Sequence, residues 1–425
     1  MKSLNPGVQR RELWAWAMYD FANSGYTTVI LTAVFSTYFV SVVAQDQTWA
    51  TFAWTCALSA SYLLVMLTLP GLGARADARG AKRRLLFSST VGCLAATALL
   101  AFAGPGMVAL ALVAIALSNY CYCVGESACA SFLPELARPS ALGRVSGWGW
   151  GFGYFGGMLT LGIALFIVIR AQGSGTTAVD YVPWIVATTC AVFAVATLPA
   201  FLLLKERARP AGATAAGPAM LHRLRQTWRE IGVTHPEFRA FLWCVACYQA
   251  GISVVITLAA VYASQAMGFT MQQNMTLIFL VNIAAAAGAF AFGHIQDRLG
   301  HRRALSATLV GWIVMVLVAY AAVTPGIFWI AATLAGLCMG SSQSAGRAMT
   351  GALAPSHRTG EFFALWGFAV QCAAVIGPIS YGTVSWMTGG NHRLAILVCL
   401  VFFVGGIALL MRVDMPRGLA RVAAR

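Results

Sequence analysis

The most informative side chains of this sequence are the few polar ones that interrupt its long apolar stretches. A carboxylate or guanidinium at the centre of a membrane helix is disfavoured by about 2.5–3.5 kcal/mol on insertion scales, so its presence there indicates a function. Carboxylates exchange protons, amides hydrogen-bond a solute, and a guanidinium binds an anionic group. The residues that could bind a solute or a proton in this way are Asp20, Asn23, Asn119, Glu126, Gln249, Gln343 and Arg347.

Glu126 is the first candidate for proton coupling. It lies about two helical turns from Pro134 and has no close partner in the sequence. Removal from water disfavours the charged form of a carboxylate, which prepares it to take up and release a proton. We therefore predict that Glu126 carries a coupling proton or binds a cationic group of a solute. Asp20 is the second candidate, although its position near a helix end is equally consistent with a structural role.

Two further candidates are placed by their distance along the chain. At an offset of about half the chain, Glu126 corresponds to Gln343, and we expect these two side chains to face each other across a central cavity. Arg347 lies only a turn or two from Pro355, where a basic residue can simply follow the bias of positive charge toward the cytoplasm.

A short loop pattern occurs twice, about half a chain apart, and predicts a gate. The first glycine of each copy lets a helix approach a neighbour, the aspartate can cap a helix N-terminus, and the last glycine suits a left-handed turn. We predict that both aspartates hold a cytoplasm-closed state, with Glu135, Arg144, Arg358 and Glu361 forming salt bridges that break and re-form. The gating residues are Gly73, Asp77 and Gly80 in the first copy, and Gly293, Asp297, Arg298 and Gly300 in the second.

The composition excludes an ordinary soluble domain. Hydrophobic residues make up 59% of the chain and charged residues only 10%, which requires lipid as the surrounding solvent. The net charge of +15 is dispersed among short loops, so we do not expect nucleic acid as a partner. The 11 cysteines all lie in apolar runs, and Cys244 and Cys247 lack a second pair, so we expect neither a metal nor another cofactor.

Twelve apolar runs are long enough to cross a bilayer as helices, at about 20 residues each. We therefore predict an all-α membrane protein with a six-helix half at 1–204, a cytoplasmic linker at 205–239 and a second six-helix half at 240–425. The predicted spans are 15–43, 49–72, 85–104, 107–130, 146–169, 181–204, 240–263, 274–293, 304–323, 326–348, 362–385 and 393–412.

The basic residues predict the orientation in the membrane. All of the 28 Lys and Arg residues except Arg170 and Arg393 fall on one side if the N-terminus is cytoplasmic. Positive charge is retained on the cytoplasmic side, so we expect both termini there, in a membrane of the bacterial inner-membrane type.

The repeated loop resembles the G-x-x-x-D-R-x-G-R-[RK] signature of the major facilitator superfamily, with Ala78 in the first copy where that family usually has arginine. The resemblance implies the major facilitator fold, in which helices one, four, seven and ten line a central cavity. The stretches Tyr19–Ser24, Phe132–Ala137, Gly340–Ser344 and Glu361–Phe363 resemble, more narrowly, the "unknown major facilitator" branch that includes the vacuolar amino-acid effluxer of autophagy.

This resemblance implies a secondary active transporter, with amino acids or similar metabolites as the solute and export as the direction. We expect alternating access, protons as the coupling ion, the lipid bilayer and a small molecule as partners, and a monomer. Two alternatives stay open: a polytopic membrane enzyme acting on a lipid-linked substrate, and a uniporter without ion coupling. Enzymatic chemistry is not expected, because the histidines are scattered among basic loops.

Overall fold

The fold is all-helical. A computed structural model describes residues 3–207, 220–269 and 271–423. Within these ranges, 12 helices are long and apolar enough to cross a membrane, which confirms the predicted spans. They are Arg10–Val43, which begins as α1 (Arg10–Tyr26), then α3 (Ala50–Arg79), α4 (Lys82–Leu99), α5 (Val108–Ala130), α7 (Leu142–Gly173), α8 (Ala178–Leu203), α10 (Pro236–Met267), α11 (Met271–Leu299), α12 (His301–Ala321), α13 (Pro325–Leu353), α14 (Thr359–Met387) and α15 (His392–Ile396) with α16 (Val398–Leu410).

Local sequence sets where several of these helices begin and end. Proline is the first residue of α10 and α13, a position where its missing N–H has no intrahelical partner in any case. Gly80 follows α3 with φ 59°, and Gly300 separates α11 from α12 with φ 85°. Gly80 therefore adopts the left-handed turn that the sequence predicts, whereas Gly300 has a positive φ but a ψ of 153°, outside the left-handed region.

The first span is less regular than the others. After α1 the chain continues as π-helix at Thr27–Ala33, as the short α2 (Phe35–Tyr38), and as π-helix again at Phe39–Val43. The wider turn is visible in the bond from the Val34 N–H to the Val29 carbonyl, which measures 2.9 Å. The part of this span that carries Asp20 and Asn23 is regular α-helix.

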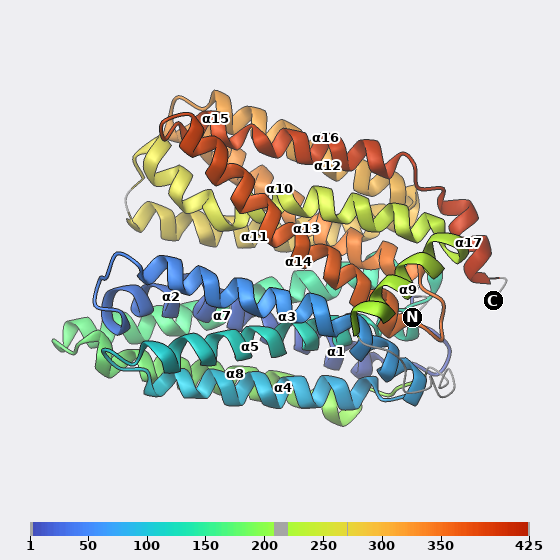
Figure 1. Ribbon diagram of the computed structural model, residues 1–425, viewed down its shortest axis with the longest axis horizontal. Coiled ribbons are helices and arrows are strands. Elements are labelled where there is room, and N and C mark those ends of the chain that lie inside the picture. Colours follow the sequence, from blue (N-terminus) through green and yellow to red (C-terminus); the bar gives the residue numbers. More distant parts are fainter. Residues whose placement is uncertain (1–2, 208–219, 270, 424–425) are drawn as a thin grey trace.

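The spans form two bundles of six helices (Figure 1). The helices from α1 to α8 form one half, and those from α10 to α16 form the other. Both repeated loops, the N-terminus, α9 (Met220–Thr234) and α17 (Met415–Ala423) lie at one end of the molecule, which we call the basic end. The predicted linker at 205–239 lies partly outside the described residues. Within it α9 is a helix, and α10 already begins at Pro236.

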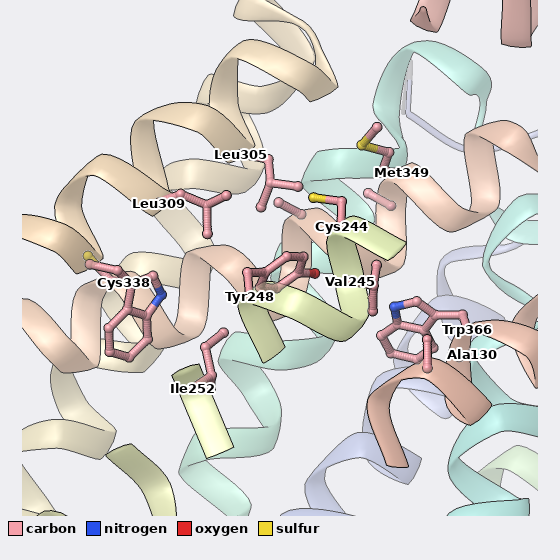
Figure 2. Packing of buried hydrophobic residues seen from close by; sticks show 14 of the residues in the cluster. Ala130, Cys244, Val245, Tyr248, Ile252, Leu305, Leu309, Cys338, Met349 and Trp366 are labelled. Carbon is pink, nitrogen blue, oxygen red and sulfur yellow. The ribbon is translucent and has the colours of Figure 1, made fainter. Parts of the chain in front are cut away.

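The apolar core joins the two halves at the basic end. One buried cluster runs through the second half and also includes Leu4, Trp16, Phe132 and Val145 of the first half. Figure 2 shows part of it, with Ala130 of α5 beside Trp366 of α14. A second cluster, between Ala22 and Ala196, consists of residues of the first half alone. The halves therefore share a core near the basic end, and the first half also has a core of its own. Smaller clusters join the halves farther along, where Tyr154 packs with Ala285 and Ala286, and Val65 belongs to a cluster with Ala364.

Candidate functional site

The two repeated loops each bind the start of a helix in the other half. The Asp77 carboxylate, at the end of α3, accepts hydrogen bonds from the backbone N–H groups of Gly360 at 3.0 Å and Glu361 at 2.8 Å. These residues are in the first turn of α14, where N–H groups have no intrahelical partner. Asp77 is only 5% exposed, so its hydrogen bonds are shielded from water.

The second copy makes the same contact with pseudo-twofold symmetry. The Asp297 carboxylate, at the end of α11, accepts hydrogen bonds from the N–H groups of Gly143 at 2.9 Å and Arg144 at 3.2 Å, at the start of α7. The side chain of Arg144 also lies 3.6 Å from the same carboxylate. Each aspartate thus caps a helix across the interface between the halves.

The first glycine of each loop is required by the close approach of two backbones. A Cβ at Gly73 would collide with the carbonyl of Gly360, and one at Gly293 would lie 2.7 Å from the carbonyl oxygen of Gly143. Arg298, by contrast, is exposed and makes no ion pair within the described part of the chain. Its gating role remains a prediction.

Lys82 makes a contact between the halves that the sequence does not predict. It lies only two residues beyond Gly80 and is 1% exposed. Its ammonium group forms an ion pair with Glu135 and donates a hydrogen bond of 2.9 Å to the Thr359 hydroxyl of the other half. In the sequence this lysine is one member of a basic loop, and only its three-dimensional neighbours distinguish it.

The four predicted salt-bridge residues are all paired at this end. The pairs of Glu135 and Arg144 join different helices as predicted, whereas Arg358 and Glu361 pair with each other locally at the start of α14. Glu135 pairs with Lys82, Arg144 with Asp297, and Arg358 with Glu361 at 2.7 Å. Arg358 also pairs with Glu230 of α9 at 2.7 Å. Burial lowers the pKa of Arg358, but the hydrogen bonds to Glu361 and Glu230 outweigh it and raise this pKa above its ordinary value.

Deeper in the interface, Asp20 and Arg347 form a buried ion pair between the halves. Arg347 Nη1 lies 2.7 Å from Asp20 Oδ2, and the two side chains are 3% and 11% exposed respectively. The guanidinium also donates to the Ser146 hydroxyl at 3.1 Å and to the Ser146 carbonyl at 2.9 Å. It lies over the rings of Trp16 and Trp150, at 4.6 Å and 5.3 Å from their centres. Arg347 therefore does more than follow the charge bias of the loops.

Glu126 differs from Asp20 in having no ion pair within the described residues. It is half-buried on α5 and lies near enough to Asp20, Arg347 and the Tyr122 hydroxyl to interact with each. Gln343 donates no hydrogen bond to it. Gln343 instead accepts a hydrogen bond of 2.7 Å from Gln249, so these two candidates pair within the second half.

Several neutral polar groups deep in the bundle have no hydrogen-bond partner among the described residues. Asn23 is buried with both of its amide atoms unpaired, and Asn119 donates 2.6 Å to Ser61 but leaves its oxygen unpaired. Each group lies about two to four turns from the end of its helix at the basic end, on α1, α5, α7, α10, α13 or α14. We call them the central polar belt: Asn23, Asn119, Trp150, Tyr248, Ser344 and Trp366.

Unpaired buried polar atoms are rare because each is destabilising by about 1–3 kcal/mol. Their occurrence at similar depths on six helices makes them candidates for hydrogen bonds to a ligand. The sequence reading found Asn23 and Asn119 and missed Trp150, Ser344 and Trp366, since indole and hydroxyl groups are ordinary residues in membrane helices.

Other features contribute no site. No group of three or more potential metal ligands occurs in the part of the chain that is described. Cys244 and Cys247 donate separately to the carbonyls of Gly406 and Phe402 at 3.2 Å and 3.3 Å, as packing residues against α16. A surface pocket of about 500 Å³, lined in part by Trp386, lies at the other end of α14, far along the helix from the polar residues described above.

Comparison with known proteins agrees with the fold. The most similar curated relatives include the uncharacterized MFS-type transporter YxiO of Bacillus subtilis (strain 168), 26% identical over 93% of both chains. They also include autophagy-related protein 22 of Cryptococcus neoformans, 26% identical over 65% of this chain and 53% of that protein.

Solved structures show the same architecture. The human organic anion transporter MFSD10 matches with a TM-score of 0.73 at 15% identity, over 94% of this chain and 99% of that one. The Escherichia coli fucose:proton symporter FucP matches with a TM-score of 0.72 at 14% identity, over 95% and 98%. The family model described as "Vacuole effluxer Atg22 like" matches residues 50–423. The chain therefore belongs to the Atg22-like vacuole effluxer family, a group of transporters with the major facilitator fold.

Proposed function

We propose that this protein is a proton-coupled secondary transporter that exports a small solute, of the amino-acid class, across a bacterial-type inner membrane. It works as a monomer with both termini in the cytoplasm. The export direction is supported by membership in a family described as vacuole effluxers. The amino-acid solute rests on the resemblance of the sequence to the branch that includes the vacuolar amino-acid effluxer of autophagy. The remaining steps rest on the gate and on the polar groups behind it.

The observation that carries the proposal is the set of polar contacts that join the two halves near the basic end. Asp77, Asp297, Lys82 and the Asp20–Arg347 pair all join the halves toward the basic end. Farther from that end the first half keeps a core of its own. Because basic loops stay in the cytoplasm, the basic end is the cytoplasmic one, and the conformation is closed to the cytoplasm. Alternating access then requires these contacts to break and the halves to rock about a central site.

The central polar belt and Glu126 supply the central site. The belt offers hydrogen-bond donors and acceptors without protein partners, which a solute can occupy. Glu126 is the one membrane-embedded candidate carboxylate left outside an ion pair, since Asp20 is held by Arg347. A carboxylate of this kind is suited to bind and release a proton as its surroundings alternate between water and protein.

The test is a binding screen followed by a flux measurement. The purified protein is screened by thermal shift against amino acids, short peptides, sugars and drug-like amines, since a ligand that binds only the folded state raises its stability. A stabilising solute is then offered to proteoliposomes with and without a pH gradient. Gradient-driven accumulation supports the proposal. Equilibration without accumulation supports the uniporter, and chemical conversion of a lipid-linked substrate without flux supports the enzyme.

A further inference from the structure

Two donors of the central polar belt converge on one glycine. The Tyr248 hydroxyl of α10 and the Trp366 indole N–H of α14 both lack a protein partner. They lie 2.5 Å and 3.8 Å from the point where a Cβ at Gly346 of α13 would stand. In Figure 2 the two side chains lie on either side of Val245, with their polar atoms directed toward one another.

Two comparable aromatic donors of the second half do have partners. Tyr248 is 0% exposed and Trp366 is 4% exposed. Tyr262, on the same helix as Tyr248, is also fully buried but donates to the Ala319 carbonyl at 2.8 Å. The fully buried Trp312 donates to the Ser342 hydroxyl at 3.3 Å. Buried tyrosines and tryptophans normally have a hydrogen-bond partner of this kind. The neighbouring Tyr248 and Trp366 donors, which have none among the described residues, therefore call for an explanation.

The hydrogen-bonding capacity of Tyr248 and Trp366 favours a ligand group that accepts hydrogen bonds. The indole N–H can only donate and the tyrosine hydroxyl can donate as well as accept, so an oxygen with free lone pairs can pair with both groups at once. Hydrogen bonds are strongest when the acceptor is ionised. No acidic side chain pairs with Tyr248 or Trp366 among the described residues.

We propose that Tyr248 and Trp366 form a subsite that holds an anionic oxygen, a carboxylate first of all, of the transported solute. This inference rests on the proposed transport function and adds which part of the solute is recognised and by which atoms. The hydroxyl rests against Gly346 so closely that even a methyl group there would collide with it. The subsite is therefore closed in this conformation, and it opens when α13 moves relative to α10 and α14.

The experiment compares probes that differ only at the acceptor. The purified full-length protein is titrated by thermal shift with L-leucine, L-alanine and L-lysine, with the amide of each, and with the amine that lacks the carboxyl group. Inorganic phosphate serves as an anion of different shape. At least one amino acid should bind about tenfold more tightly than its amine, with the amide between them. Tyr248→Phe and Trp366→Phe should each weaken the amino acid about tenfold and leave the amine unchanged.

Matched variants separate recognition from packing. Tyr262→Phe and Trp312→Phe remove donors that are already paired, so they should lower the midpoint temperature without changing the preference for the carboxylate. Tyr248→Phe removes an unpaired hydroxyl and should leave the midpoint temperature of the ligand-free protein unchanged or raise it. A fall equal to that of Tyr262→Phe would mean that the hydroxyl has a partner in the protein, and would overturn the proposal.

Three binding outcomes also count against the subsite. They are equal weakening of amino acid and amine, tighter binding of phosphate than of any carboxylate, and no binding of any carboxylate probe. In the last case, flux of another solute in proteoliposomes would leave the transport function standing and remove only the subsite. No flux of any solute would count against the transport function itself.

Discussion

Asp77→Asn tests the gate at its most buried contact. Each oxygen of the Asp77 carboxylate accepts one backbone hydrogen bond from the first turn of α14. Asparagine keeps one acceptor, turns an NH₂ group toward the other N–H, and removes the negative charge from the helix N-terminus. A hydrogen bond to a charged group contributes about 1.5–3 kcal/mol, and a charge at a helix terminus about 0.3–2 kcal/mol. Because these contributions overlap, we expect the closed state to lose about 1–3 kcal/mol, a shift of roughly 5- to 150-fold toward the cytoplasm-open state.

The shift can be measured with one buried cysteine. Ala364 of α14 is fully buried, and its Cβ lies 2.9 Å from the place of a Cβ at Gly73 of α3. Ala364→Cys, on a background without the native cysteines, reacts with a water-soluble maleimide only when α3 and α14 separate. When labelling is limited by the open fraction, adding Asp77→Asn should raise its rate by that same factor of roughly 5 to 150.

A matched aspartate outside the interface gives the control. Asp414 on the approach to α17 forms an exposed pair with Arg417, whose side chain is 76% exposed. Asp414→Asn should leave the labelling rate unchanged. Asp297→Asn should act in the same direction as Asp77→Asn, because it removes the equivalent cap of α7. Equal labelling rates with and without Asp77→Asn would refute the latch, whatever the effect on transport.

Three more predictions follow from the site. Glu126→Gln should abolish solute accumulation driven by a pH gradient and keep solute exchange, because exchange needs no net change of protonation. If accumulation survives in Glu126→Gln and is lost in Asp20→Asn, Asp20 of α1 carries the coupling proton instead. Gly149→Ala places a Cβ 2.5 Å from Asp20 Oδ2 and 2.6 Å from Arg347 Nη2. This overpacking should destabilise the closed state by about 1–3 kcal/mol and lower the midpoint temperature of unfolding. Gly162→Ala is the control on the same helix, because its Cβ meets nothing within 4 Å and the midpoint temperature should not fall. A cysteine at Val233, which is 83% exposed on α9, should resist impermeant reagent in intact cells and react in inverted vesicles; labelling in intact cells would reverse the orientation.

The sequence predicts well those features that depend on spacing along the chain. Span length follows from bilayer thickness, and the positive φ of Gly80 and Gly300 follows from a turn that only glycine adopts easily. The capping contacts of Asp77 and Asp297 were foreseen in kind, because a carboxylate after a helix suits free N–H groups. The sequence does not predict which helix each aspartate caps, because that helix lies in the other half of the chain.

Features that arise between distant segments were beyond the sequence reading. Asp20 and Arg347 are 327 residues apart, and no local pattern shows that they meet. Glu126 was rightly described as lacking a sequence partner, yet its neighbours in space are these same two charges. Trp366 looks like any membrane tryptophan until its indole N–H is seen to have no acceptor. Burial and pairing across the interface therefore carry the information that single-chain patterns lack.

The two capping contacts share main-chain geometry but differ in how much water reaches them. Beside Asp297 the partner Arg144 is 33% exposed, whereas beside Asp77 the nearby Lys82 is 1% exposed. Dissolved ions screen exposed charges and scarcely reach buried ones. A higher ionic strength should therefore weaken the charged contact between α7 and α11 and have almost no effect on the contact between α3 and α14. As the salt concentration rises, the contact between α7 and α11 weakens more than the contact between α3 and α14. We therefore expect the halves to separate first between α7 and α11 and to rotate about the α3–α14 contact. Labelling rates of single cysteines at the two contacts, followed through a salt titration, would show the order.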